Sequence, residues 1–511
     1  MHPVSAATEN TEDSRLEWSM NGLHSIQPKL SARRRFSVAQ VCSMVVAAVG
    51  MVIGFVLLPV ATGTLLMSLM IGAYLLALGM RLELMARGGE GRHSFTDAEL
   101  GAMDWETLPS YTILVPAYKE PEVLQSLVQH LDALEYPRDR LEILLLLEQD
   151  DHETVAAASA MGLVHPFRVV LIPPSEPRTK PKALNYAIVD TTSDLITIYD
   201  AEDRPDPLQL LKVVATFAAC GEEVACVQCE LGYFNADENI ITRWFATEYR
   251  TWFSRFLPSL SQVDAPIPLG GTSNHIRRDV LMGVGAWDPY NVTEDADLGV
   301  RLRRQGYRVA VADSVTLEEA NTDFVNWIKQ RSRWYKGYLQ TWLVHMRSPR
   351  SLLRDVGFGG FVRFNLFVGG TPLLALLNPI SWTLLVLWFV LQPQFIVDIM
   401  PWPVYYTGLF GWIVGNSLFY YLNLTVAYEL GLRGVIKAAL LLPLYWVMMS
   451  IAAVKAAVQL IFNPSYWEKT HHGLSRQQPA AETSGDCEEG PVGANDVTRQ
   501  GASGEVVHAP S

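Results

Sequence analysis

The chain has few cysteines, few charged residues and no excess of positive charge. Its 511 residues include five cysteines, an odd number that does not make a disulfide scaffold. Cys226 and Cys229 form a single CxxC pair, which is too few ligands for a closed zinc site, so we expect buried thiols. A net charge of −13 excludes a general nucleic-acid binder, because neutralising phosphates requires clustered Lys and Arg.

Charged residues make up only 18% of the chain and hydrophobic residues 49%, and the hydrophobicity is uneven. Apolar runs at 38–60 and 61–80 are each long enough to cross a hydrocarbon core of about 30 Å. Arginines on both flanks of this pair predict that both flanks, and the block that follows, are cytoplasmic. Further spans are predicted at 369–391, 404–426 and 435–461, and we favour an even total because residues 467–476 have a cytoplasmic charge pattern.

The polar block between these runs alternates short apolar segments with helical patterns. Five segments rich in Val, Ile and Leu read as buried strands: 111–118, 141–147, 167–172, 195–199 and 224–231. Helical patterns lie between most of them, for example at 121–134 and 207–219. This alternation predicts a mostly parallel α/β sheet, in which ligands bind at the carboxyl ends of the strands.

Acidic residues follow two of these strands directly. Asp200-Ala-Glu202-Asp203 follows 195–199, and Asp200 with Glu202 could hold Mg²⁺ or Mn²⁺ through oxygen ligands, neutralising a leaving diphosphate. Asp150 and Asp151 follow 141–147 and could accept hydrogen bonds from a base or a ribose. The alternative for both clusters is structural, because acids after a strand also cap the next helix.

Three further motifs allow both a structural and a chemical interpretation. Lys180 and Lys182 open a helix, where they either bind a phosphate or lie solvated on the surface. Thr293-Glu-Asp295 opens another helix, either as a cap or with Asp295 as a general base. Gln330-Arg-Ser-Arg-Trp334 is either an interfacial anchor or a site in which Arg333 faces a diphosphate and Trp334 a sugar.

The order and spacing of these motifs resemble those of the membrane-integrated, processive family 2 glycosyltransferases, which include cellulose, hyaluronan and curdlan synthases. The resemblance covers roughly residues 80–342 and includes the QxxRW and TED patterns. It implies catalytic residues Glu294, Asp295, Gln330 and Arg333. It implies donor binding by Asp150, Asp151, Lys182, Asn185, Asp200 and Glu202, and acceptor binding by Gly271, Thr272, Ser273 and Trp334.

Two features depart from the family pattern. The metal motif reads Asp-Ala-Glu rather than Asp-x-Asp, although Glu202 is a competent oxygen ligand and Asp203 could share the role. No recognisable cyclic-dinucleotide-binding domain follows the membrane part, so direct control of that kind is not expected.

The resemblance implies a cytoplasmic GT-A-type α/β domain flanked by transmembrane helices in the inner or plasma membrane. The expected divisions are a basic tail 1–36, a transmembrane hairpin 37–84, the transferase domain 85–350, an interfacial helix and transmembrane bundle 351–462, a membrane-proximal motif 463–476 and a disordered acidic tail 477–511.

The expected function is inverting transfer of a hexose from a UDP-sugar, expected to be UDP-glucose, onto a growing β-glycan, with Mg²⁺ or Mn²⁺ as cofactor. The expected partners are the donor, a polysaccharide or glycolipid acceptor, membrane lipids and export proteins, with no nucleic acid. Two alternatives stay open: transfer of a single sugar to a lipid, and a transporter that a soluble domain regulates.

Overall fold

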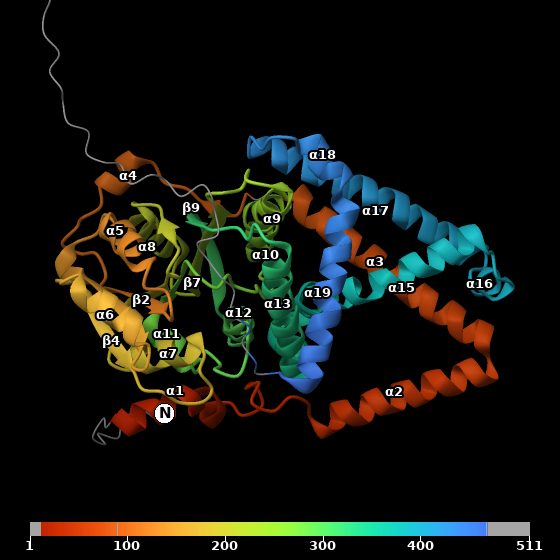
Figure 1. The fold of residues 1–511 in the computed structure, drawn as a ribbon, viewed down its shortest axis with the longest axis horizontal. Coiled ribbons are helices and arrows are strands. Elements are labelled where there is room, and N and C mark those ends of the chain that lie inside the picture. Colours follow the sequence, from red (N-terminus) through yellow and green to blue (C-terminus); the bar gives the residue numbers. More distant parts are fainter. Residues whose placement is uncertain (1–11, 89, 465, 467, 469–511) are drawn as a thin grey trace, which may run out of the picture. The chain divides into compact units, whose positions relative to one another are not determined.

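The computed structural model describes residues 12–88, 90–464, 466 and 468 (Figure 1). The predicted acidic tail 477–511 and most of the membrane-proximal motif lie outside the described residues.

A nine-stranded sheet forms the centre of the polar block, and it contains all five predicted strands. Its strands are β1 (Arg92–His93), β2 (Tyr111–Ala117), β3 (Leu141–Glu148), β4 (Phe167–Ile172), β5 (Leu195–Ile198), β6 (Arg204–Pro205), β7 (Val224–Tyr233), β8 (Asn274–Arg277) and β9 (Arg308–Glu318). Their order is β1-β9-β7-β8-β5-β2-β3-β4, with β6 paired to β9. Strand β2 pairs in parallel with both β3 and β5, so the acids that follow those two strands meet at one edge of the sheet.

The sheet is mixed, which refines the prediction of a mostly parallel one. Strand β8 is antiparallel to both of its neighbours, β5 and β7. The sequence pattern missed β8 because three of its four residues, Asn274, His275 and Arg277, are polar. It missed β9 because Asp313, Ser314 and Thr316 interrupt the apolar run along its length.

Helices cover both faces of the sheet, because alternate residues of the central strands point to opposite sides. On one face, Leu114 and Leu144 pack in a core with α7 (Lys180–Ile188). On the other, Ile113 and Ile143 pack with α5 (Leu124–Asp132) and α8 (Gln209–Cys220). The remaining helices of this part are α4 (Asp97–Gly101), α6 (His152–Ala160), α9 (Ile240–Thr251), α10 (Leu257–Gln262), α11 (Arg278–Gly283), α12 (Glu294–Arg304) and α13 (Phe324–His345).

The predicted N-terminal tail contains a docked helix, α1 (Glu12–Ile26), which packs against α7. Leu23 is only 1% exposed, and Arg15 forms an ion pair with Asp190 at 2.5 Å. Polar composition alone does not reveal this helix, because few of its residues are buried.

Four helical segments of the described residues are long and apolar enough to cross a membrane: Val38–Leu57 (α2), Pro59–Ala86 (α3), Pro349–Val390 and Leu442–Phe462 (α19). The third consists of α14 (Pro349–Phe364), a π-helical turn at Asn365–Gly369 and α15 (Gly370–Val390). The predicted span 404–426 lies in α17 (Trp402–Glu429), which is not among the four. Its tyrosines and asparagines lower its mean hydropathy. The short helices α16 (Gln394–Ile399) and α18 (Val435–Leu440) connect these segments.

Candidate active site

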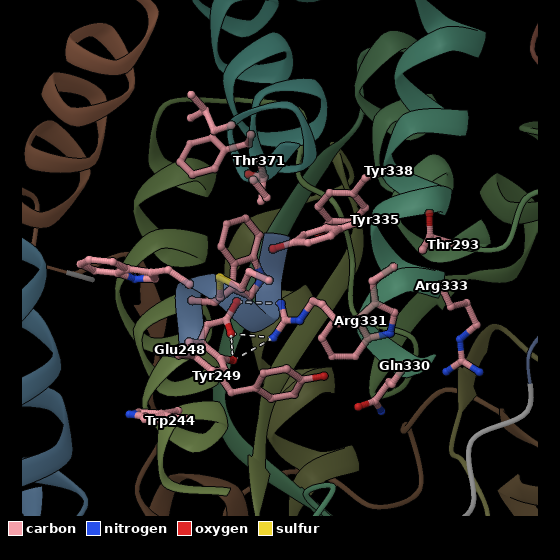
Figure 2. A pocket seen from close by; sticks show the side chains of 18 of the residues that line it. Trp244, Glu248, Tyr249, Thr293, Gln330, Arg331, Arg333, Tyr335, Tyr338 and Thr371 are labelled. Carbon is pink, nitrogen blue, oxygen red and sulfur yellow. Dashed lines mark hydrogen bonds and ion pairs between the residues drawn. The ribbon is translucent and has the colours of Figure 1, made fainter. Parts of the chain in front are cut away.

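A cavity of about 1030 Å³ begins at the carboxyl ends of the strands and continues between the apolar helices. Its polar part is lined by residues from the loops after β2 and β5 and from α7, α12 and α13. Its apolar part is lined by residues of α3, α15, α17 and α19. Figure 2 shows part of the lining, with Arg333 and Gln330 on one side and Glu248, Tyr249 and Trp244 on the other.

The loop after β5 places an acidic cluster in this cavity. Lys180 Nζ donates hydrogen bonds to the Asp200 carboxylate and, at 2.8 Å, to the Gly271 carbonyl. Asp203 is fully buried, and its carboxylate accepts hydrogen bonds from the Asp200 backbone at 2.7 Å and from the Thr272 hydroxyl. Asp203 therefore holds the turn that presents Asp200 and Glu202.

The acids of this cluster affect one another strongly. Burial, followed by the charges of Asp200 and Glu202, raises the pKa of Asp203 well above its usual range. Burial also raises the pKa of Glu318, at the end of β9, and the same three aspartate and glutamate charges add to the effect. The carboxyl groups of this cluster therefore repel one another, and a bound cation would lower their pKa values.

The Thr293-Glu-Asp295 motif lies at the start of α12, as predicted. Thr293 occupies the N-cap position, but its side chain makes no capping hydrogen bond. Burial raises the pKa of Asp295 to about 6, and burial together with the charge of Asp295 raises the pKa of Glu294 to about 8. A Cβ added at Gly271 would lie 3.2 Å from Asp295 Oδ2, so this glycine leaves the carboxylate accessible. Asp295 has the pKa that a general base at neutral pH requires.

The QxxRW motif lies on α13. Burial lowers the pKa of Arg333, and the charges of Glu294 and Asp200, which line the same cavity, oppose that effect. Gln330 Oε1 accepts a hydrogen bond from Asn321 at 2.7 Å. The Trp334 ring stacks on Tyr249, with ring centroids 5.8 Å apart and planes 24° apart.

Most of the predicted site residues meet in this one cavity. Those that line it are Asp200, Glu202, Gly271, Thr272, Glu294, Asp295, Gln330, Arg333 and Trp334. Asp150, Asp151, Lys182, Asn185 and Ser273 do not line it.

Neither of the two aspartates after β3 lines the cavity. Asp151 caps α6: its carboxylate accepts from Thr154 N at 3.4 Å and from Lys119 N at 2.5 Å. Asp150 is exposed and pairs with Arg178 at 2.6 Å. Arg178 does line the cavity and also donates to the Tyr118 hydroxyl at 3.1 Å. Asp150 thus reaches the cavity through Arg178.

Lys182, Asn185 and Ser273 have structural partners in this conformation. Lys182 is fully buried and pairs with Glu148 at 2.8 Å. The Asn185 amide donates to the backbone carbonyls of Ser19 and Trp287 at 3.1 and 2.8 Å, which ties α1 to α7. Ser273 is fully buried and donates to Thr316 Oγ1 at 2.6 Å.

Several charged residues that line the cavity were not predicted as site residues: Arg81, Glu120, Glu148, Arg178, Glu248, Glu318 and Arg331. Lys180 also lines the cavity, and the sequence offered it together with Lys182 as a phosphate ligand. Lys180 is the first residue of α7. Because phosphates bind at helix N-termini, this position could have indicated that Lys180, rather than Lys182, is the phosphate ligand. The sequence around Glu248 and Glu318 contains no motif that marks them as site residues, because only the tertiary fold brings them to the cavity.

The donor set fits a hard divalent cation that substrate phosphates help to hold. Asp200, Glu202 and Asp203 are oxygen donors, and Asp203 Oδ1 is buried without a hydrogen-bond partner in the described part of the chain. No three His, Cys, Asp or Glu side chains among the described residues could hold a metal ion by themselves. Mg²⁺ is often bound by one or two carboxylates together with substrate phosphates, so this arrangement remains compatible with it.

Comparison with known proteins gives a family match over the same region. The family described as "Glycosyltransferase like family 2" matches residues 109–337. The chain is 28% identical over 244 residues to the probable glycosyltransferase YdaM of Bacillus subtilis, covering 45% of this chain and 55% of that protein. It is 28% identical over 242 residues to a beta-monoglucosyldiacylglycerol synthase of Trichormus variabilis, covering 46% and 50%.

A more distant relative is the cellulose synthase 1 catalytic subunit of Komagataeibacter xylinus, 25% identical over 248 residues and covering 46% of this chain and 32% of that protein. The matches thus span about half the length of the first two relatives. Among solved structures, a mannosyltransferase from Pyrobaculum calidifontis in complex with GDP-Man and Mn²⁺ aligns with a TM-score of 0.46 at 18% identity, over 78% of this chain and 99% of that one.

The family match covers every strand of the sheet except β1, together with the acidic cluster, the TED motif and most of the QxxRW helix. Residues 109–337 therefore match the family 2 glycosyltransferase model, and they fold as an α/β domain with a mixed sheet.

Proposed function

We propose that the protein transfers a hexose, with inversion, from a UDP-sugar to the end of a growing β-glycan. In this proposal the domain is cytoplasmic, the apolar helices span the membrane and UDP-glucose is the donor. The observation that carries the proposal is the single cavity, which joins the acidic cluster and Asp295 to a space between four long helices. A separate transporter activity receives no support from a domain of this family.

The reaction follows from the charges around the cavity. Asp295 accepts the proton of an acceptor hydroxyl, and the oxygen attacks the anomeric carbon on the face opposite the diphosphate. The bond between that carbon and the diphosphate oxygen breaks, and the electron pair leaves with UDP. Arg333 and Lys180 offset the charge that develops on the diphosphate. A divalent ion held by Asp200 and Glu202 would add further neutralisation of the leaving group.

The donor base fits at the end of β2, where Tyr118 and Arg178 line the cavity. The Arg178 guanidinium lies over the Tyr118 ring, 5.6 Å from its centroid, and pairs with Asp150. This arrangement offers an aromatic ring and hydrogen-bonding groups to a uracil and its ribose, so Asp150 acts on the donor through Arg178.

The helical part of the cavity suits a sugar chain. Its lining combines aromatic rings, which pack on the CH faces of sugars, with amides that bind hydroxyl groups. The rings include Trp382 and Trp388 of α15, Trp412 of α17 and Trp446 of α19, and the amides are Asn378, Asn416 and Asn423. This lining supports a route by which the glycan leaves the transfer site.

The deciding experiment is UDP release by the purified full-length protein across UDP-glucose, UDP-galactose and UDP-N-acetylglucosamine with Mg²⁺ or Mn²⁺, followed by linkage analysis of the product. We expect one preferred donor and a β-linked polymer. Release of UDP from none of these donors would refute the proposal.

A second candidate is transfer of a single sugar to a lipid. It is favoured by the relative named as a beta-monoglucosyldiacylglycerol synthase and by the apolar residues, such as Leu374 and Met449, that also line the cavity. Vesicles with and without diacylglycerol separate the two candidates: a glycolipid that forms only with diacylglycerol favours this one.

A further inference from the structure

Arg331 lies inside the QxxRW motif, at a position to which the motif gives no role. It is 5% exposed and lines the cavity on α13. Its guanidinium donates two hydrogen bonds to one carboxylate, at 2.8 Å to Glu248 Oε1 and 2.6 Å to Glu248 Oε2. Glu248 belongs to α9, so this bidentate pair joins α13 to α9.

A tyrosine from the last apolar helix completes the cluster. Tyr445 of α19 donates a hydrogen bond from its hydroxyl to Glu248 Oε2 at 2.5 Å and accepts one from Arg331 at 3.2 Å. Figure 2 shows the bonds between Arg331 and Glu248 as dashed lines. The Arg331–Glu248–Tyr445 cluster therefore links the family 2 domain to a helix of spanning length.

The same guanidinium also contacts the tryptophan of the motif. The Cζ atom of Arg331 lies 4.8 Å from the ring centroid of Trp334 and 5.2 Å from the ring centroid of Phe245. Trp334 stacks on Tyr249, which neighbours Glu248 on α9. The indole thus contacts both Tyr249 and a cation whose own position is fixed by Glu248 and Tyr445.

Within the cluster, the positive charge of Arg331 is paired with the negative charge of Glu248. Burial lowers the pKa of Arg331, but the Glu248 carboxylate and the Tyr445 hydroxyl outweigh burial and raise it, so the guanidinium stays charged. A surface anchor would leave its charge in water, whereas Arg331 uses its charge within the protein. Loss of one member leaves another buried polar group without its partner, so each should matter to the geometry.

We propose that Arg331, Glu248 and Tyr445 are positioning residues that fix Trp334 against α19, so that the acceptor end passes over the indole between the transfer site and the helical part of the cavity. The proposal rests on the proposed function for the identity of the acceptor, but not for the position of Trp334. It separates two tasks within one motif: Arg333 faces the diphosphate, and Arg331 holds the residue that receives the acceptor.

The test compares Tyr445→Phe with wild type in the full-length protein, with Tyr421→Phe as the matched control. Tyr421 lies on α17, is 62% exposed and does not line the cavity. Cellopentaose is the acceptor probe. Because one hydrogen bond is removed, we expect the KM for cellopentaose to rise about fivefold, the KM for UDP-glucose to hold and any polymer to shorten. The control should match wild type.

Glu248→Gln and Arg331→Lys should have the same effect more strongly. A merely structural role would instead lower the yield of folded protein and raise both KM values together. The second readout is the position of the Trp334 indole in cryo-EM maps of the three variants, which requires no activity. A displaced indole supports the proposal even if no sugar polymer is found, whereas an indole in its wild-type place in all three variants would overturn it.

Discussion

Gly337 of α13 lies directly against Thr293, the residue that opens the TED motif. A Cβ added at Gly337 would lie 2.7 Å from Thr293 Cβ, closer than real side chains approach. Two hydrogen bonds support the contact: Asn291 donates to Thr341 Oγ1 at 2.9 Å, and Val292 N donates to Gln340 Oε1 at 3.2 Å. The helix that carries Arg333 therefore sets the position of the loop that presents Asp295.

Gly337→Ala should reduce kcat about 100-fold, because a shift of about 1 Å at Asp295 misaligns the base. Helix propensity alone favours alanine, so a loss of activity would reflect the clash. The measurement is UDP release with saturating donor. Gly79→Ala is the control, since Gly79 also lies inside a helix and an added Cβ there meets nothing within 4 Å. Equal activities of the two variants would contradict the conclusion that the contact between Gly337 and Thr293 positions Asp295.

The value of kcat/KM should rise with increasing pH through about pH 6. The pKa of Asp295 is raised by burial to about 6, and a base acts only when deprotonated, so kcat/KM should fall about tenfold per pH unit below that value. Asp295 and Glu294 interact, so the two steps near 6 and 8 belong to the pair. Asp295→Asn should abolish transfer at every pH, while UDP binding persists. Near-normal turnover in that variant would disprove the assignment of the base.

Two neighbouring lysines should behave differently. Lys180→Met removes a cation from the cavity and should raise the KM for the donor about tenfold with little change in melting temperature. Lys182→Met leaves Glu148 buried without its partner and should lower the free energy of unfolding by about 3 kcal/mol or more. Kinetics and thermal melts of both variants decide, and a stable Lys182→Met protein with poor donor binding would reverse the assignment.

Chelation with EDTA should stop UDP release, and added Mg²⁺ or Mn²⁺ should restore it. Glu202→Gln removes one anionic oxygen from the acidic cluster and should raise the metal concentration for half-maximal activity about tenfold. Asp279→Asn is the matched control, because the Asp279 side chain is 98% exposed. Full activity in EDTA would count against a metal-assisted reaction.

The sequence reveals those parts of the fold that depend on local pattern. Continuous apolar runs located β2, β3, β4, β5 and β7, and acids placed directly after strands located Asp200 and Glu202. It could not reveal β9, in which the polar residues Ser314 and Thr316 are buried and accept hydrogen bonds from Gln209 of α8.

Residues that reach the site only through tertiary packing also escaped prediction. Lys180 and Lys182 are two positions apart, yet one lines the cavity and the other is buried beneath it. Motif similarity alone could not separate them, because both occupy the first turn of α7. Glu248 and Tyr445 are 197 positions apart and share a hydrogen bond that no local pattern encodes.

The α/β domain and the apolar helices together form the wall of the cavity, so neither part of this protein contains the whole cavity when separated from the other. A soluble fragment spanning 85–350 would retain Asp200, Asp295 and Arg333 but lose Tyr445 and every cavity residue of α3, α15, α17 and α19. Such a fragment would expose Trp334 and its aromatic neighbours to water and invite aggregation. Biochemical work should therefore treat the transferase and its helices as one indivisible catalytic unit, solubilised whole.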